Sequence, residues 1–399
     1  MSRIAITGIG IITPLGDTLT LNRQALQEGR SGLSSLEIFP TKYASLLPFG
    51  EIKITDKELK TRLDVTEPGV TRTTLLALHA FKQAVENCGL SASEIQLSET
   101  AFINGTTVGG MCLSDALYQD ANFRETGSEY LNSYDLSSVT LYIQQRYGIT
   151  GICNTFNTAC SSSANAIMYG ARLIQNGFVK RAIVGGADSL AKFTINGFNS
   201  LGILSSAPCR PFDNARSGLN LGEGAAFLVL EKEDNVIDKP VYAYVSGWAN
   251  SNDAFHPSSL SDDGEGPYLA MQQALQVARI SPKEISFINT HGTATENNDE
   301  KESIAMQRVF GNVPAFASTK SNIGHTLGAA GAVEAVFCLL NLIHDEVYAS
   351  LNFDTPIEAT GLVPVTEYKH MRVEHVMSNS FGFGGNCSSL IFSKGQKAQ

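Results

Sequence analysis

Short apolar runs alternate with longer amphipathic segments along most of the chain. Runs of apolar and β-branched residues between glycine or polar turns predict buried strands, and apolar positions spaced three or four apart predict helices. Strands are predicted at 3–12, 100–108, 181–189, 225–232, 241–249, 284–292 and 388–394, and helices at 71–89, 161–177, 266–280 and 328–345. This alternation is typical of an α/β fold.

The pattern also repeats once within the chain. Residues 86–107 contain the end of a helix and then a strand with the sequence Phe-Ile-Asn, and residues 276–293 contain the same elements in the same order. A spacing of about half the chain favours duplication of a structural unit. We therefore expect two similar halves, 1–239 and 240–399, divided after a charged segment.

Composition and charge narrow the class of protein. Of the 399 residues, 43% are hydrophobic and 17% charged, which excludes a mainly disordered chain. A net charge of −10 argues against a nucleic-acid partner. The longest apolar stretch, in 328–343, is interrupted by Glu334, so we expect no membrane insertion.

The seven cysteines form no CxxC pair, so the sequence suggests neither a zinc site nor a disulfide framework, and we expect no metal. Reduced thiols indicate the cytoplasm. The apolar N-terminal segment lacks the cationic region and the cleavage site of a signal peptide and fits a buried strand better.

Cys160 is the first candidate for chemistry. It follows a run of small residues and directly precedes the predicted helix 161–177. A helix N-terminus favours a thiolate and lowers the pKa of the thiol, which makes it a nucleophile. The alternative is a small buried cysteine beside a helix cap.

His291 is the second candidate, because it leaves a predicted strand into a loop of glycine and threonine. Such positions often carry catalytic side chains, although a satisfied loop histidine is the alternative. The nearby Thr293 and Thr295 either bind a ligand amide or cap the helix that begins near Asp299.

Two further motifs follow. Lys320 and His325 precede the apolar helix in a glycine-rich turn, but no GxxxxGK[ST] sequence is present, so a phosphate loop is not indicated. In the second, glycines at 382, 384 and 385 let the backbone approach a ligand, and their N–H groups can face a developing oxyanion. A tight turn between strands is the alternative.

These four motifs in this order resemble the elongating β-ketoacyl-acyl-carrier-protein synthases of the thiolase superfamily, which use a Cys-His-His triad. The motifs are Cys160, His-Gly-Thr at 291–293, Lys-x-x-x-Gly-His at 320–325 and Gly-Phe-Gly-Gly at 382–385. The likeness spans nearly the whole chain and includes 185–189, 210–226 and 252–259.

The resemblance implies a five-layer α-β-α-β-α fold made from two duplicated halves. The first half would carry the nucleophile and the second the two histidines, with the site between them. Members are usually dimeric through a central strand of the first half, so the partner would be a second copy, a related ketosynthase or a chain-length factor.

The resemblance also assigns catalytic roles. Cys160 would hold the acyl group, and the backbone N–H groups of Cys160 and Phe383 would form the oxyanion hole. His291 and His325 would stabilise the enolate left when malonyl-carrier protein loses CO₂. Lys320 would order the site together with Glu302. The product would be a 3-oxoacyl thioester in fatty acid, polyene or polyketide elongation.

Further positions match the substrate-binding residues of the family. Ser258, Thr293 and Thr295 would hold the phosphopantetheine arm that carries the substrate, and the protein itself would bind no cofactor. The acyl pocket would be lined by Val108, Phe198 and Phe381. Residues that would contact the acyl carrier protein are Arg62, Arg72 and Arg216.

Other members of the superfamily fit less well. Degradative thiolases need a second catalytic cysteine, and Cys387 lacks the surrounding CxG motif. Starter-type synthases have asparagine where this chain has His325. Chain-length factors, which are non-catalytic partners of ketosynthases, lack the nucleophile that Cys160 supplies, but such a role is the alternative function.

One segment departs from ordinary fatty-acid enzymes. Residues 65–69, Val-Thr-Glu-Pro-Gly, stand where those enzymes carry several basic residues for the acidic carrier. Carrier docking would then need another mode or a partner subunit. This departure leaves open a specialised aryl-polyene or other secondary-metabolite enzyme beside a fatty-acid one.

Overall fold

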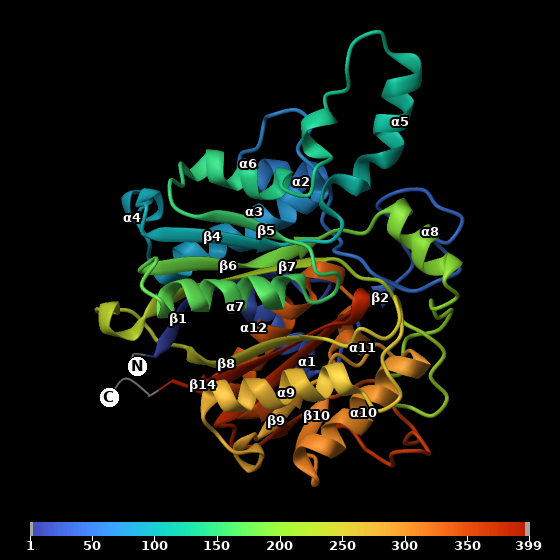
Figure 1. The fold of residues 1–399 in the computed structure, drawn as a ribbon. Coiled ribbons are helices and arrows are strands. Elements are labelled where there is room, and N and C mark those ends of the chain that lie inside the picture. Colours follow the sequence, from blue (N-terminus) through green and yellow to red (C-terminus); the bar gives the residue numbers. More distant parts are fainter. Residues whose placement is uncertain (1–2, 396–399) are drawn as a thin grey trace.

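The computed structural model describes residues 3–395, and its strands form one mixed sheet of two similar parts (Figure 1). The strand order is β10-β9-β13-β14-β8-β1-β7-β6-β4-β5. The first part contains β1 (Ile4–Ile12), β4 (Thr100–Gly105), β5 (Cys153–Phe156), β6 (Arg181–Asp188) and β7 (Gly224–Lys232). The second contains β8 (Ala243–Asn252), β9 (Phe287–Asn289), β10 (Ala315–Ala317), β13 (His375–Gly382) and β14 (Asn386–Lys394).

The two parts match strand by strand. In the first part β4 lies parallel to β5 and β6, and β7 runs antiparallel to β6 and β1. In the second part β9 lies parallel to β10 and β13, and β14 runs antiparallel to β13 and β8. The two Phe-Ile-Asn sequences fall on β4 and β9, which occupy equivalent places. The expected duplication of structure is therefore confirmed.

Helices form three layers around the two parts of the sheet. In Figure 1, α3 and α6 lie above the first part, α7 and α12 lie between the two parts, and α9 and α10 lie below the second part. The helices are α1 (Leu19–Gln27), α2 (Asp56–Leu63), α3 (Arg72–Cys88), α4 (Ala92–Gln96), α5 (Ser114–Phe123), α6 (Ser138–Tyr147), α7 (Ser162–Gln175), α8 (Lys192–Ser200), α9 (Glu265–Ala278), α10 (Glu296–Phe310), α11 (Lys320–Ile323) and α12 (Ala330–His344). The predicted five-layer α-β-α-β-α arrangement is thus confirmed.

Two short two-stranded sheets lie outside the main sheet. One pairs β2 (Leu33–Ser34) with β3 (Phe49–Gly50), and the other pairs β11 (Glu346–Val347) with β12 (Lys369–His370). They are too short to have a hydrophobic face of their own. β3 contacts α11, and β11 contacts α12.

The central helices explain why the sequence contains such apolar segments. The segment Leu327–His344, which includes α12, is long and apolar enough to cross a membrane, but 89% of it is buried inside the protein. It packs with α7 in the largest apolar cluster, where both sheet parts contribute side chains. A helix covered on both sides needs no polar face. Its hydrophobicity therefore reflects its place in the core.

Local signals fix the ends of the better-predicted helices. The Thr71 side chain accepts a hydrogen bond from the Thr74 N–H at the start of α3, and Gly89 ends the helix with φ 70°. Both are preferred cap residues. In the main sheet, the short strands β5 and β10 and the eight-residue strand β13 were not predicted, and β9 is shorter than the predicted 284–292.

Candidate active site

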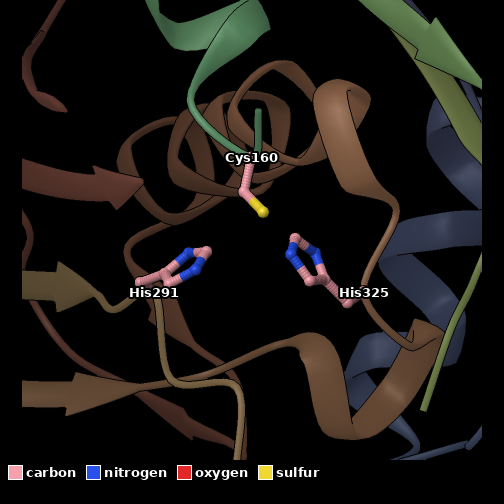
Figure 2. Close-up of side chains that lie close together, drawn as sticks. All are labelled: Cys160, His291 and His325. Carbon is pink, nitrogen blue, oxygen red and sulfur yellow. The ribbon is translucent and has the colours of Figure 1, made fainter. Parts of the chain in front are cut away.

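A strained turn places Cys160 at the start of α7. The preceding residue, Ala159, has φ 51°, which is unfavourable for a residue with a Cβ atom. This left-handed residue turns the chain sharply between β5 and α7. The Cys160 side chain is consequently directed away from the helix toward the second half (Figure 2). Only 6% of Cys160 is exposed.

His291 follows β9, and a buried carboxylate holds its backbone. The N–H groups of His291 and Gly292 donate to the two oxygens of Glu302 on α10, at 2.9 and 2.8 Å. Gly292 has φ 37°, and a Cβ there would lie 2.6 Å from Ser318 Cβ. The strand end and the carboxylate therefore fix the histidine in one place.

His325 lies on the turn between α11 and α12. Its N–H donates to the Asn220 carbonyl at 2.7 Å, and the preceding Gly324 has φ 74°. Neither ring nitrogen of His325 has a hydrogen-bond partner among the described residues. Buried polar atoms are normally paired. The unpaired nitrogens are therefore available to a substrate.

The three side chains meet in one place (Figure 2). The Cys160 sulfur and a nitrogen of each histidine all lie within 4.8 Å of one another. The imidazole centroids are 5.4 Å apart and the rings are nearly perpendicular, at 84°. One small reacting group can therefore touch all three side chains at once.

Burial controls the protonation of this cluster. It raises the pKa of the Cys160 thiol to about 11, although the Lys320 ammonium acts in the opposite direction. The predicted lowering of the thiol pKa is therefore wrong, because desolvation of the thiolate outweighs the helix N-terminus. Burial, helped by Lys320, also lowers the pKa of both histidines. The resting site thus holds a thiol beside two neutral imidazoles.

Lys320 pairs with a residue that the sequence reasoning did not select. Its ammonium contacts the Glu334 carboxylate on α12, and both side chains are buried. The predicted partner, Glu302, instead accepts from His291, Gly292 and Asn379. That pairing was wrong because α12 rather than α10 packs beside Lys320. A lone carboxylate in an apolar helix was the available signal.

Two backbone N–H groups face the nucleophile. The N–H groups of Phe383 and of Cys160 itself act on the sulfur and oppose the rise in its pKa. Gly382 allows this approach, since a Cβ there would lie 3.1 Å from the Cys160 nitrogen. Two N–H groups converging on one point are the arrangement of an oxyanion hole.

A cavity of about 430 Å³ opens onto the triad. Ser258, Thr293 and Thr295 line it, and the hydroxyl groups of the two threonines lie 2.9 Å apart. Thr295 precedes α10 but makes no side-chain cap there. Its hydroxyl is thus directed to the neighbouring threonine and the cavity rather than to the helix.

Aromatic side chains contribute to the apolar part of the cavity. Phe198 and Phe383 stack with centroids 5.9 Å apart and an interplanar angle of 19°, and Phe381 lies 5.8 Å from the His291 ring. All three line the cavity. Val108 is fully buried in the adjacent apolar cluster and is not part of the lining.

Two of the three predicted carrier-contacting arginines are not on the surface. Arg72 is 6% exposed and pairs with Glu223, and Arg216 is 8% exposed and donates to backbone carbonyls of 213, 295 and 296. Both predictions were wrong, because each guanidinium joins segments of the interior. Arg62 is exposed and pairs with Asp17 at 2.8 Å.

The triad also has the composition of a metal site. One sulfur and two imidazole nitrogens suit a soft ion such as Zn²⁺. The same atoms suit nucleophilic catalysis, which uses a thiol beside a proton acceptor. The expectation that the site needs no metal stays a prediction.

Comparison with known proteins agrees with this arrangement. The family described as "Beta-ketoacyl synthase, N-terminal domain" matches residues 1–235, and "Beta-ketoacyl synthase, C-terminal domain" matches residues 242–354. The 3-oxoacyl-[acyl-carrier-protein] synthase 2 of Vibrio cholerae is 32% identical over 98% of this chain and 99% of its own length.

Two solved structures are similar over 99% of this chain. The ishigamide ketosynthase/chain length factor has a TM-score of 0.92 at 28% identity and is covered completely. A ketosynthase in complex with its chain length factor from Xenorhabdus doucetiae has a TM-score of 0.87 at 33% identity, with 98% of that chain covered. The chain therefore belongs to the β-ketoacyl synthase family.

Proposed function

We propose that this protein is a 3-oxoacyl-[acyl-carrier-protein] synthase that joins an acyl group to a malonyl unit with loss of CO₂. The observation that carries this proposal is the convergence of Cys160, His291 and His325 at the base of one cavity. The curated relative from Vibrio cholerae, similar along its full length, has this activity in its name.

The first half-reaction moves the acyl group to the enzyme. The Cys160 thiol passes its proton to a neutral imidazole as its sulfur attacks the carbonyl of an acyl thioester. The N–H groups of Cys160 and Phe383 stabilise the oxyanion, and loss of one such donor commonly costs about 10²–10³ in rate. The carrier thiol then leaves with the proton.

The second half-reaction forms the carbon–carbon bond. Malonyl thioester loses CO₂, and the electron pair of the broken bond moves onto the thioester oxygen as an enolate. His291 and His325 are neutral and each can donate one N–H to that oxygen. The enolate carbon attacks the acyl carbonyl, the bond from that carbon to the Cys160 sulfur breaks, and the thiolate takes a proton from solvent water.

The remaining side chains support these steps. Burial keeps the histidines neutral and the charge of Lys320, which pairs with Glu334, adds to this effect, while Glu302 holds the backbone of His291. Ser258, Thr293 and Thr295 line the path for a phosphopantetheine arm, and the acyl chain extends beside Phe198 and Phe381. The phosphopantetheine belongs to the carrier protein, so this chain needs no cofactor of its own.

The partners follow from the same arrangement. An acyl carrier protein delivers both substrates. The strand offered for pairing with a second copy or a related subunit is β5, which lies at the edge of the described sheet and not, as the resemblance implied, at the centre of the first half. Two of the similar solved structures are named as a ketosynthase together with a chain length factor. The presence of all three triad residues favours a catalytic subunit over a chain-length factor.

Two organisational proposals accompany the activity. We divide the chain into halves 1–239 and 240–399, supported by strands that fall within 4–232 and 243–394. We also place the protein in the cytoplasm, where its seven free cysteines would stay reduced.

Intact mass spectrometry tests the first half-reaction. Incubation with an acyl carrier protein should add one acyl group to the wild type and none to Cys160→Ala. Cys387→Ala is the matched control, because Cys387 is buried on β14, and it should still become acylated. Acylation of Cys160→Ala would refute the assignment, and loss of acylation in Cys387→Ala alone would favour a thiolase-type site.

Product analysis tests the second half-reaction. With malonyl-carrier protein added, the wild type should release CO₂ and form a 3-oxoacyl product. His325→Ala should keep part of its Cys160 acylation and lose decarboxylation. Equal loss of both steps would contradict the assigned division of roles.

A further inference from the structure

Asp188 is a buried carboxylate that accepts hydrogen bonds from both halves of the protein. It ends β6 and has no exposed surface. One oxygen accepts from the Thr106 hydroxyl at 2.6 Å and the Val108 N–H at 2.9 Å. The other accepts from the Thr107 N–H at 2.9 Å and the Gly328 N–H at 2.7 Å. Gly328 belongs to the second half and the other donors to the first.

The first-half contacts lead directly to the nucleophile. The Thr107 N–H donates to Asp188, and the Thr107 hydroxyl donates to the Ala159 carbonyl at 3.0 Å. Ala159 is the strained residue immediately before Cys160. A shift of Thr107 would therefore move the turn that directs the sulfur.

The second-half contact leads to a histidine. Gly328 lies on the short helical turn Leu327–Ala329 that follows His325, and Leu327 has φ 53°. The approach is close, since a Cβ at Gly328 would lie 2.7 Å from the Asp188 oxygen. The carboxylate therefore anchors the turn that carries His325.

The charge of Asp188 also affects the protonation of Cys160. Its hydrogen-bond partners in the described part of the chain are neutral donors, so no adjacent cation cancels its charge. The carboxylate acts to raise the pKa of the Cys160 thiol, and burial raises its own pKa to about 6. Asp188 does not line the cavity, so it cannot touch the substrate there.

We propose that Asp188 is a positioning residue that sets the separation of Cys160 and His325 across the two halves. A buried aspartate that only closed one turn would bond within a single segment. Asp188 instead joins two segments, and each leads within a few residues to a member of the triad. This inference rests on the proposed condensation, which needs both side chains on one substrate.

Asp188→Asn is the first test. The asparagine amide has the shape of the carboxylate, but its NH₂ group replaces one oxygen that accepts N–H or O–H hydrogen bonds in the wild type. The variant therefore loses the hydrogen bonds of one of the two Asp188 oxygens. We expect kcat to fall by roughly 10²-fold, the effect of a displacement of about 1 Å in an active site. The KM for the carrier-bound substrates should change little, since the cavity lining is intact.

Alkylation of Cys160 by iodoacetamide provides a readout that needs no substrate. Removing the carboxylate charge should lower the pKa of the Cys160 thiol, so the midpoint of the alkylation rate against pH should move to lower pH in Asp188→Asn. A carboxylate whose charge does not act on Cys160 would leave this midpoint in place. The alkylation profile is also independent of the proposed function, because it needs no condensation. If the wild type fails to condense substrates, the proposed function is refuted, but the effect of Asp188 on Cys160 can still be measured.

Two further variants complete the design. Glu231→Gln is the matched control, because Glu231 is a buried carboxylate on β7 whose partners Thr7, Arg181 and Lys239 lie away from the triad. Gly328→Ala displaces the Gly328 turn from Asp188 but keeps the carboxylate charge. It should therefore lower kcat without moving the midpoint of the alkylation profile. If Asp188→Asn does not fold, this variant tests the proposal in its place. A kcat within about threefold of wild type, an unmoved midpoint in Asp188→Asn, or an equal loss of kcat in Glu231→Gln would overturn the proposal.

Discussion

Replacing Lys320 by methionine tests how charge is balanced beside the triad. Methionine keeps an unbranched apolar side chain and removes the ammonium. The Lys320 and Glu334 side chains are 2% and 1% exposed, so the substitution leaves a carboxylate in the core without a cation. One Glu334 oxygen already has no hydrogen-bond partner in the described structure. Removing one partner of such a pair typically lowers the free energy of unfolding by about 3–5 kcal/mol.

The size of this loss should depend on pH. Burial raises the pKa of Glu334 above its ordinary value even with Lys320 present, because desolvation costs more than the cation returns. Without Lys320 the pKa rises further. Consider a carboxyl group whose pKa is higher in the folded than in the unfolded protein. Its contribution to the free energy of unfolding is fully present below the pKa of the unfolded state, and it is lost as the pH rises through the pKa of the folded state.

The pH dependence predicts a difference that grows with pH. In the wild type, the free energy of unfolding stops falling with pH once Glu334 has ionised beside Lys320. In Lys320→Met, Glu334 ionises only at higher pH, so the free energy of unfolding continues to fall by about 1.4 kcal/mol per pH unit. At mildly acidic pH the two proteins should therefore be similar. About two pH units higher, the variant should be less stable by roughly 2–4 kcal/mol.

Urea unfolding of the wild type, both single variants and the double variant at these two pH values checks this reasoning. Lys320→Met combined with Glu334→Gln removes both charges, and its free energy of unfolding should return to within about 1 kcal/mol of the wild type. An equal loss at both pH values would refute the reasoning, as would a double variant no more stable than Lys320→Met.

Three other predictions concern the nucleophile, the mouth of the cavity and a corrected assignment. Because the pKa of the Cys160 thiol is about 11, its alkylation rate should rise with pH well beyond neutrality, and a plateau from near pH 7 would contradict the stated pKa. Phe383→Ala removes the stack with Phe198, worth about 0.5–1.5 kcal/mol, so acyl-enzyme should hydrolyse several-fold faster when followed by intact mass, and an unchanged half-life would show that this stack does not keep water from the acyl group. Arg72→Met leaves the buried Glu223 carboxylate without its cation and should lower the free energy of unfolding by about 3–5 kcal/mol, while a raised KM for the carrier in the folded variant would restore the docking role of Arg72.

The sequence predicted those elements whose pattern alone fixes their type. The helix at 328–345 and the strands at 3–12 and 225–232 are long and apolar, and they occupy the core of the fold. The missed strands are short or polar. β13 contains buried serine and asparagine, and its Asn379 donates to Glu302 on α10, a tertiary contact that no local pattern reveals.

The same distinction applies to the site. The triad was predicted because Cys160, His291 and His325 each lie in a recognisable local motif. The pKa of the thiol and the partner of Lys320 were wrong, because both depend on burial and on which helix packs beside them. The prediction that Arg72 and Arg216 contact the carrier protein was wrong for the same reason, since the exposure of a side chain is a property of the folded chain.

The join between the two parts of the sheet restricts how the enzyme can move. β1 pairs with β8 over Ile4–Ile6 and Ala243–Val245, and α12 lies in the apolar cluster between the parts. Hinge opening would break these backbone hydrogen bonds and expose that cluster to water. The two halves should therefore stay together throughout turnover. The acyl and malonyl substrates then enter a site whose two halves do not move apart. Side chains and loops at the entrance of the cavity, rather than domain motion, would control their entry.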